Sequence, residues 1–285
     1  MKVLIVGANG QLGRGLTESA PGDAEIVRHD IDTLDIADRE AVEAVVEAVQ
    51  PDILFNAAAY TAVDKAESEE ALALAVNGTA VGLLSEAARR VRAQFVHVST
   101  DFVFDGRSGI PYQPNDATNP LSAYGRTKLV GEALAGPDAL IVRTAWVYAP
   151  QGGNFVRTML RLMSERPQVR VVADQIGTPT YAPDLAVALW ALAAKGVTGT
   201  HHYTDSGAAS WYDFAVAIQE EALAMGVLKA PVPVVPISTA EFSTPAQRPH
   251  YSVLDKASTF SALGAAAPHW RANLRKMIAG ILSEE

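Results

Sequence analysis

The 285-residue sequence contains no cysteine, which excludes both a disulfide framework and catalysis by a thiolate. Basic residues are also scarce: 23 lysines and arginines stand against 32 acidic residues, giving a net charge of -9. A nucleic-acid-binding domain is expected to carry a basic patch or stripe. We therefore expect no nucleic acid among the partners of this protein.

Long apolar runs are missing as well. Near the start, an apolar run of only four residues separates Lys2 from Gly7, which is too short for the core of a signal peptide. Nowhere does an uninterrupted apolar run approach the ~20 residues of a membrane span. Together with the missing cysteines, this predicts a cytoplasmic protein with no membrane association.

Short apolar runs alternate with longer helical patterns through the first half of the chain. Such alternation predicts an α/β fold, a Rossmann-type doubly wound parallel sheet whose ligands collect beyond the carboxyl ends of the strands. The expected strands are 3–6, 25–28, 53–55, 95–98 and 140–142, and the expected helices are 11–19, 38–49, 69–91 and 123–135.

Proline and glycine become frequent after residue 149, and the regular alternation ends. We predict a dinucleotide-binding domain over 1–149 and, mainly within 150–285, a smaller C-terminal substrate lobe. A helix over 181–194 is expected to return to the sheet domain. Ser210 has capping-box spacing with Asp213, and His201-His202 is expected to be an ordinary strand pair rather than a metal site.

Gly7, Gly10 and Gly13 lie between the first strand and the first helix. Glycines in this context allow a tight turn, close approach to a pyrophosphate and close helix packing. The helix N-terminus adds free N–H groups for phosphate. This pattern predicts a nicotinamide dinucleotide.

Acidic residues near the end of the second strand bear on the choice of cofactor. Asp30 is suited to the ribose hydroxyls of NADH, whereas Arg14 and Arg28 leave NADPH open. Further along, Asp35 either lies near the adenine or caps a helix, and capping is the preferred interpretation for Asp38. Three alanines, residues 57–59, leave the end of the third strand open to a flat ring or ribose.

Tyr124 and Lys128 are four residues apart on the expected helix 123–135, so they share a face. A phenol beside a cation can pass a proton to a carbonyl oxygen, and nearby positive charge is expected to lower the phenol pKa. Thr100, at the end of the fourth strand, can bond the same oxygen. The alternative is a half-buried Tyr124 beside a merely solvated Lys128.

These motifs resemble the extended short-chain dehydrogenase/reductase family. Longer segments, including 56–67, 99–106, 143–148, 154–160, 174–180 and 244–249, are similar to the dTDP-4-dehydrorhamnose reductases within it. The resemblance covers nearly the whole chain. It implies NADPH- or NADH-dependent reduction of the 4-keto group of dTDP-4-dehydro-L-rhamnose to dTDP-L-rhamnose.

The resemblance also implies roles for individual residues. Tyr124 would be the proton donor, Lys128 its modulator and ribose anchor, and Thr100 the partner of the substrate oxygen. The expected cofactor-binding residues are Gly7, Gly10, Gln11, Leu12, Gly13, Asp30, Asp35, Ile36, Ala59, Tyr60, Thr61, Tyr124 and Lys128. The expected substrate-binding residues are Thr100, Asp101, Trp146, Asn154 and Arg248.

Some of these residues have structural alternatives. Trp146 could be core packing, Asn154 could cap a helix near Phe155, and Arg248 could be solvated. Some relatives bind Mg²⁺ at a dimer interface through a glutamate of the first helix, and this chain has Gly15 there. We therefore expect no metal, and a homodimer stays open.

Two other functions fit the same fold. One is a nucleotide-sugar epimerase or 4,6-dehydratase, and the other is a non-catalytic dinucleotide-binding regulatory subunit. The presence of both Tyr124 and Lys128 weighs against the regulatory subunit. In the dehydratases that the chain resembles, a glutamate follows the aspartate, whereas Phe102 follows Asp101 here.

Overall fold

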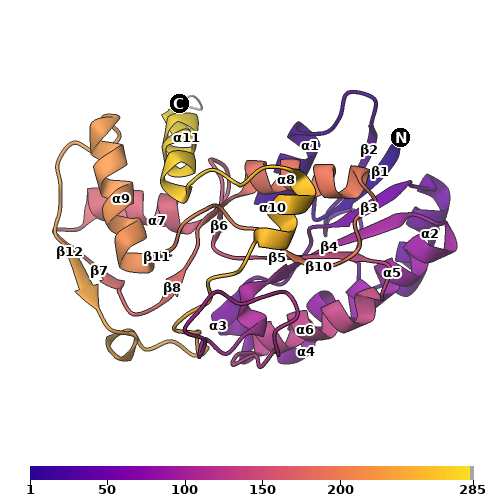
Figure 1. Cartoon of the computed structure of the whole chain (residues 1–285), viewed down its shortest axis with the longest axis horizontal. Coiled ribbons are helices and arrows are strands. Elements are labelled where there is room, and N and C mark those ends of the chain that lie inside the picture. Colours follow the sequence, from indigo (N-terminus) through magenta and orange to yellow (C-terminus); the bar gives the residue numbers. More distant parts are fainter. Residues whose placement is uncertain (283–285) are drawn as a thin grey trace.

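A parallel sheet forms one half of the molecule in the computed structural model, which describes residues 1–282 (Figure 1). Within these residues the sheet has six strands in the order β10-β5-β4-β3-β1-β2, with β1 next to the edge strand β2, and the predicted fold class is confirmed. The strands are β1 (Lys2–Val6), β2 (Glu25–His29), β3 (Ile53–Asn56), β4 (Gln94–Thr100), β5 (Leu140–Thr144) and β10 (Gly199–His202).

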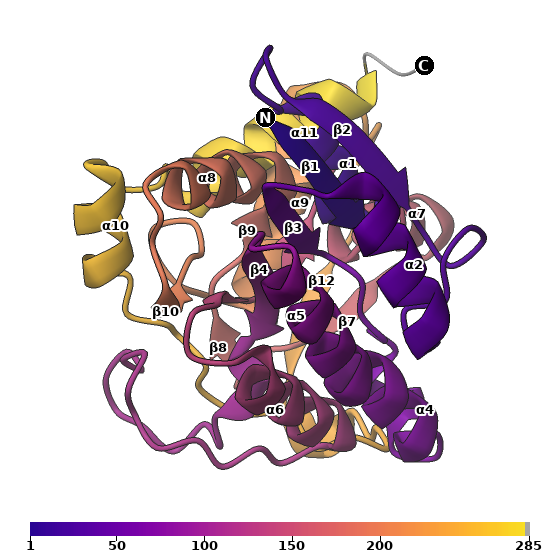
Figure 2. The ribbon, with the colours of Figure 1, turned by 90° about the vertical axis from the view of Figure 1, so that its right-hand side faces the viewer.

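Helices cover both faces of the sheet (Figure 2). Alternate side chains of β1 point to opposite faces. Val3 and Ile5 join the core beneath α1 (Gln11–Glu18) and α8 (Ala182–Ala194). Leu4 and Val6 join the core on the other face, which α2 (Arg39–Val49), α5 (Ala80–Arg90) and α6 (Ala123–Ala135) cover.

The predicted helix 69–91 is divided. The structure has α4 (Glu70–Leu74), the π-helical turn η1 (Ala75–Thr79) and then α5. The wide turn carries Asn77, whose side chain bonds the backbone N–H and C=O of Tyr60 at 2.8 and 3.0 Å. By length and composition this run could cross a membrane, but 56% of it is buried in the fold, as in a core helix.

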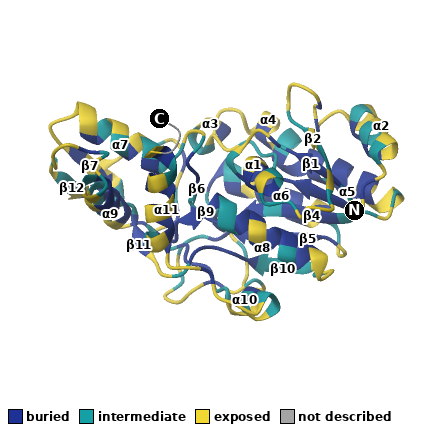
Figure 3. Cartoon of the chain, turned by 90° about the horizontal axis from the view of Figure 1, so that it is seen from above, coloured by how far each residue is buried: buried dark blue, intermediate teal, exposed yellow. Residues whose placement is uncertain are grey.

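A second lobe lies beside the sheet and has its own apolar core (Figures 1 and 3). It contains α7 (Phe155–Glu165), α9 (Trp211–Ala224), α11 (Trp270–Leu282) and the parallel pair β7 (Val169–Val172) and β12 (Val234–Ile237). The remaining short elements are α3 (Val63–Ala66), η2 (Asp101–Val103), β6 (Val147–Tyr148), β8 (Ile176–Gly177), β9 (Thr180–Tyr181), β11 (Ala209–Ser210), η3 (Thr239–Glu241) and α10 (Ala257–Leu263).

Local signals in the sequence gave correct helix starts. Asp38 caps α2, accepting bonds from two backbone N–H groups, and Ser210 forms the predicted capping box with Asp213 at α9. The sheet's sixth strand, β10, comes from the second half of the chain and pairs with β5. It contains the two histidines, of which His202 is buried and bonds the Asp255 carbonyl.

We predict that Gly131→Ala destabilises the protein. A Cβ at Gly131 of α6 would overlap the carbonyl oxygen of Asn77 in η1, so the helices must separate. Overpacking of this kind costs about 1–3 kcal/mol, which outweighs the better helix propensity of alanine. Denaturant unfolding measures the difference. Gly109→Ala is the control because open space surrounds Gly109, and equal stabilities of the two variants would contradict the prediction.

Candidate active site

The glycine-rich turn forms a bare cradle at the carboxyl end of β1. Gly7 has a positive φ of 75°, and a Cβ there would overlap the backbone of Ala58 after β3. Gly13 approaches the Gly7 carbonyl so closely that a Cβ would not fit. Gly10, the N-cap of α1, has no side chain that could occupy the N–H groups at the start of the helix. The cradle therefore keeps backbone N–H groups accessible for a pyrophosphate.

A cavity of about 570 Å³ opens beside this cradle, between the ends of β1, β2 and β3. Three alanines, Ala57 to Ala59, form part of its lining. The predicted cofactor residues at this cavity are Gly7, Gly10, Asp30, Asp35, Ile36, Ala59 and Tyr60. Its size, apolar floor and acidic rim fit an adenosine half of a dinucleotide.

Other predicted cofactor residues lie around the cavity rather than in its lining. Leu12 is buried in the core under α1, and Gly13 packs against the turn. Gln11 points toward the second lobe, where its Oε1 accepts a bond of 2.9 Å from Asn154. Thr61 is exposed beyond Tyr60.

Asp30 holds the glycine-rich turn as well as lining the cavity. Its Oδ2 accepts a bond of 2.7 Å from the Asn9 N–H, and its Oδ1 accepts one of 2.8 Å from the Ile31 N–H. Arg14 bonds the Asn9 carbonyl at 2.9 Å from the other side. Carboxylate and guanidinium therefore flank the same turn, consistent with either NADH or NADPH.

Thr100 and Tyr124 meet where β4 ends and α6 begins. Ser122 caps α6 through a bond from the Gly125 N–H, and a Cβ at Gly125 would overlap the Phe102 carbonyl. This close approach lets a hydrogen bond join the Tyr124 phenol and the Thr100 hydroxyl. The Tyr124 ring also packs edge-on against Phe102.

Lys128 points inward from the same helix. Its amine, which is buried, donates to the Val98 carbonyl at 2.6 Å and lies 3.4 Å from Nε2 of His97. Burial raises the pKa of Tyr124 to about 12, against the effect of the Thr100 bond. The expectation of a lowered phenol pKa is thus wrong for the protein without bound cofactor, because burial of the phenol dominates its pKa and the nearby Asp101 adds to the rise.

A second group of side chains lies near Thr100 and Tyr124, facing the second lobe. The Trp146 ring stacks on Trp211 with centroids 3.5 Å apart, and Trp146 has a φ of 48°, which is strained for a non-glycine residue. A cavity of about 30 Å³ is lined by Phe102, Trp146, Gln175, Trp211, Arg248, Pro249 and Ser252.

Asp101 is buried next to Thr100, with 1% of its surface exposed. Burial raises the pKa of its carboxyl to about 6, although hydrogen bonds from Ser252 and Thr100 oppose the rise. Ser252, which lowers the pKa of Asp101, also lines the small cavity together with Trp146 and Arg248.

Arg248 and Asn154 are held by other residues of the chain. Arg248 forms a bidentate ion pair with Asp64 of α3, at 2.8 and 3.0 Å, and also bonds Thr244. Asn154 caps α7 as the alternative interpretation expects, and its amide donates to Gln11 and to the Ala149 carbonyl. The Asn154 side chain thus lies beside Gln11 of α1 and not beside Arg248.

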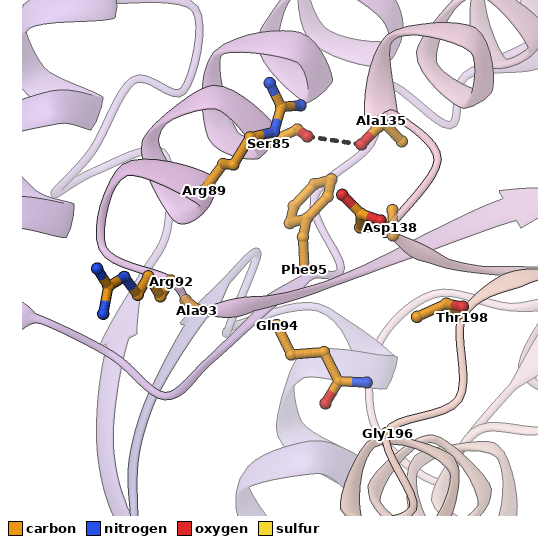
Figure 4. A pocket seen from close by; sticks show the side chains of 11 residues that line it. Ser85, Arg89, Arg92, Ala93, Gln94, Phe95, Ala135, Asp138, Gly196 and Thr198 are labelled. Atoms are coloured by element: carbon orange, nitrogen blue, oxygen red, sulfur yellow. Dashed lines mark hydrogen bonds between the residues drawn. The ribbon is translucent and has the colours of Figure 1, made fainter.

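A separate cavity of about 320 Å³ lies at the opposite edge of the sheet, near the start of β4 (Figure 4). Arg89, Arg92 and Asp138 are among its lining residues, and Ser85 bonds the Ala135 carbonyl there. Because parallel sheets bind ligands at the carboxyl ends of their strands, we do not assign this cavity to the reaction.

Within residues 1–282, no group of three or more histidine, aspartate or glutamate side chains could hold a metal. Gly15 faces α8, where an added Cβ would lie 3.3 Å from the Ala182 carbonyl oxygen. A glutamate at this position would therefore have to displace α8.

Sequence reasoning missed several residues of the site. Trp211 and Gly125 belong to no local motif that marks a site, because each acts through a contact with a distant segment. Asp64 and Ser252 likewise gain their places by long-range folding.

The fold, the glycine cradle and the Tyr124–Lys128 pair define an extended short-chain dehydrogenase/reductase. The family described as RmlD substrate binding domain matches residues 1–283. The chain is 43% identical to dTDP-4-dehydrorhamnose reductase of Burkholderia thailandensis, covering 100% of both proteins. It therefore belongs to the dTDP-4-dehydrorhamnose reductase family.

Solved structures agree with this assignment. A dTDP-4-dehydrorhamnose reductase from Clostridium acetobutylicum has a TM-score of 0.93 and 40% identity, with 100% of each chain covered. The Bacillus anthracis protein of the same name, in complex with NADP, has a TM-score of 0.92 and 37% identity, with 98% of each chain covered.

We predict that Asp101→Asn stabilises the protein at neutral pH. An unfolded aspartate has a pKa near 3.9, whereas burial raises that of Asp101 to about 6. The Asp101 carboxyl binds a proton more tightly in the folded state than in the unfolded state. The free energy of unfolding of the protein therefore falls as the pH rises from about 4 to about 6. The variant should lack that fall and gain about 1–3 kcal/mol at pH ~7.5.

Denaturant unfolding at pH ~4 and ~7.5 measures the effect of Asp101→Asn. Asp23→Asn, at an exposed aspartate, is the matched control. An identical pH dependence in wild type and Asp101→Asn would contradict the assigned carboxyl.

Proposed function

We propose that the protein reduces the 4-keto group of dTDP-4-dehydro-L-rhamnose to give dTDP-L-rhamnose, using NADPH or NADH. The observation that carries the proposal is the Thr100–Tyr124 pair at the end of β4, which Phe102 joins to the cavity lined by Trp146 and Arg248. Relatives with the corresponding name match the chain over its whole length.

The nicotinamide supplies hydride to the keto carbon when the cofactor is bound. Thr100 and Tyr124 hold the keto oxygen, and Tyr124 transfers its phenolic proton to that oxygen as negative charge develops. The high pKa of Tyr124, about 12, keeps the phenol protonated at neutral pH, as a proton donor requires. The Phe102 ring packs edge-on against that of Tyr124.

The glycine cradle, Asp30 and the alanines after β3 would hold the dinucleotide, since the bare backbone and the cavity fit it. Arg248 is suited to the diphosphate of the sugar nucleotide because a guanidinium binds phosphate oxygens bidentately. It would then exchange some of its bonds with Asp64 for bonds to phosphate. A cytoplasmic location stays a prediction, and the homodimer stays open.

Phe102 favours a reductase over a 4,6-dehydratase. Elimination of water needs an acid and a base beside the sugar, and the Phe102 side chain lines the small cavity without a group that exchanges protons. Asp101 alone offers one carboxyl. Neither an epimerase nor a regulatory subunit is favoured by a particular contact.

We predict stoichiometric loss of reduced-cofactor absorbance when dTDP-4-dehydro-L-rhamnose is added, with a product two hydrogens heavier than the substrate. With dTDP-glucose and NAD⁺ we expect no product lighter by one water, because Phe102 stands where the dehydratases have a glutamate beside the aspartate. Absorbance and sugar mass are followed together. Water loss from dTDP-glucose would contradict the reductase assignment.

Tyr124→Phe is the matched variant for this experiment. It removes only the phenolic oxygen, so kcat should fall by roughly 10²–10⁴-fold. Cofactor affinity, measured by titration, should change little. Unchanged turnover would remove Tyr124 from the mechanism, while absence of turnover in the wild type would reject the proposed substrate.

A further inference from the structure

A buried chain of three polar side chains runs behind the catalytic helix, from β3 through β4 to α6. The amide nitrogen of Asn56 lies 3.1 Å from Nδ1 of His97, and Nε2 of His97 lies 3.4 Å from the Lys128 amine. All three side chains have at most 1% of their surface exposed. The proposed mechanism assigns no task to Asn56 or His97.

The hydrogen bonds of Asn56 determine which nitrogen of His97 carries the proton. The backbone N–H of Ala58 donates to Oδ1 of Asn56 at 3.1 Å, which fixes the orientation of the amide. The other end, an NH₂ group, must then face His97, so Nδ1 accepts. A neutral imidazole has one N–H. The proton therefore lies on Nε2, the nitrogen that faces Lys128.

We propose that Asn56 and His97 are positioning residues that present an N–H, rather than a lone pair, to the amine of Lys128 and so favour its neutral form. A neutral amine accepts the bond from Nε2, and it still donates to the Val98 carbonyl. An ammonium at the same place would set two donors against each other. The imidazole thus acts on Tyr124 only through the lysine.

The surroundings of Lys128 agree with this arrangement. Burial lowers the pKa of Lys128 to about 8, while Glu132 on the same helix raises it. Glu132 is itself held by Arg143 at 2.7 and 2.9 Å and by Ser99 at 2.5 Å. Burial keeps the pKa of His97 well below 6.5, so the imidazole is neutral.

The inference deepens the proposed function, on which its catalytic meaning rests. After Tyr124 gives its proton to the substrate, the phenolate must be reprotonated before the next turnover. The Lys128 ammonium is the stronger acid of the two, since the pKa of Lys128 is about 8 and that of the Tyr124 phenol about 12, so the proton moves from the lysine to the phenolate. A lysine held near the balance between its two forms then regains its proton at neutral pH.

His97→Phe tests the sign of the interaction. Lys128 titration is followed by NMR of the ¹⁵N-labelled side chains, and its signal is identified by its loss in Lys128→Met. Removing the N–H that faces the amine should raise the Lys128 midpoint by about one pH unit. A lowered midpoint would mean that His97 accepts from the ammonium, and an unchanged one that the two groups are uncoupled; either result overturns the proposal.

His201→Phe is the control, since His201 lies on the same sheet and bonds a backbone carbonyl away from Lys128. The titration midpoint of Lys128 in His201→Phe should equal that in the wild type. The ¹⁵N shifts of His97 provide a second measurement that does not depend on a substitution of the histidine. They should report a neutral ring with the proton on Nε2, and a proton on Nδ1 would overturn the proposal.

Asn56→Asp keeps His97 and reverses its hydrogen bonding. The carboxylate accepts from both the Ala58 N–H and Nδ1, so the proton should move to Nδ1 and the Lys128 midpoint should rise. In His97→Phe and Asn56→Asp, the alkaline limb of the pH–kcat profile should shift from its wild-type position in the same direction as the Lys128 midpoint. The NMR results stand even if the keto-sugar is not turned over, which separates failure of this inference from failure of the proposed function.

Discussion

The contact between Gly125 and the Phe102 carbonyl is the constraint on which the active site depends. Because no side chain separates them, α6 comes close enough to the end of β4 for Tyr124 to bond Thr100. The next turn of the same helix carries Lys128 to the Val98 carbonyl. Gly131 allows a second close contact, with Asn77, whose side chain holds Tyr60 beside the cofactor cavity. One helix thus positions Tyr124, the proposed proton donor, and supports the cavity proposed for the cofactor.

Buried charge keeps this helix in register with the sheet. Glu132 of α6 and Arg143 of β5 form a bidentate pair that is almost fully buried, and Ser99 of β4 bonds the same carboxylate. Arg143 also bonds the Pro114 carbonyl in the loop before α6 and lies over the Phe104 ring. Removing one partner of a buried ion pair strongly destabilises a protein. The Glu132–Arg143 pair therefore fixes β4, β5 and α6 relative to one another more than it adds to stability.

Local patterns in the sequence were sufficient for the fold class and for most elements of the sheet domain. Apolar runs predicted β1 and β3, and capping residues predicted the start of α2 and α9, because these signals act within a few residues. Strand β10, with the sequence Gly-Thr-His-His, has no apolar run and is defined by pairing with β5. The π-helical turn η1 has no periodicity of its own and depends on the contacts of Asn77.

The site was predictable only as far as its motifs extend. The glycines and the Tyr124–Lys128 pair are local, so their spacing predicted where they lie. The Arg248–Asp64 ion pair and the Trp146–Trp211 stack join segments far apart in the chain, and no spacing encodes them. The inward direction of Lys128 was missed for the same reason, since it depends on the carbonyl of Val98 in another element.

The most direct test of this account is the turnover of dTDP-4-dehydro-L-rhamnose by Gly125→Ala, with Gly22→Ala, which meets open space, as the control. A methyl group at Gly125 should separate α6 from β4, and misplacement by ~1 Å is expected to lower kcat by roughly 10²-fold. Cofactor affinity should fall less than kcat, because the glycine cradle follows β1 and lies away from the contact of Gly125 with Phe102. A kcat for Gly125→Ala equal to that of Gly22→Ala would contradict the claim that this contact positions the proton donor.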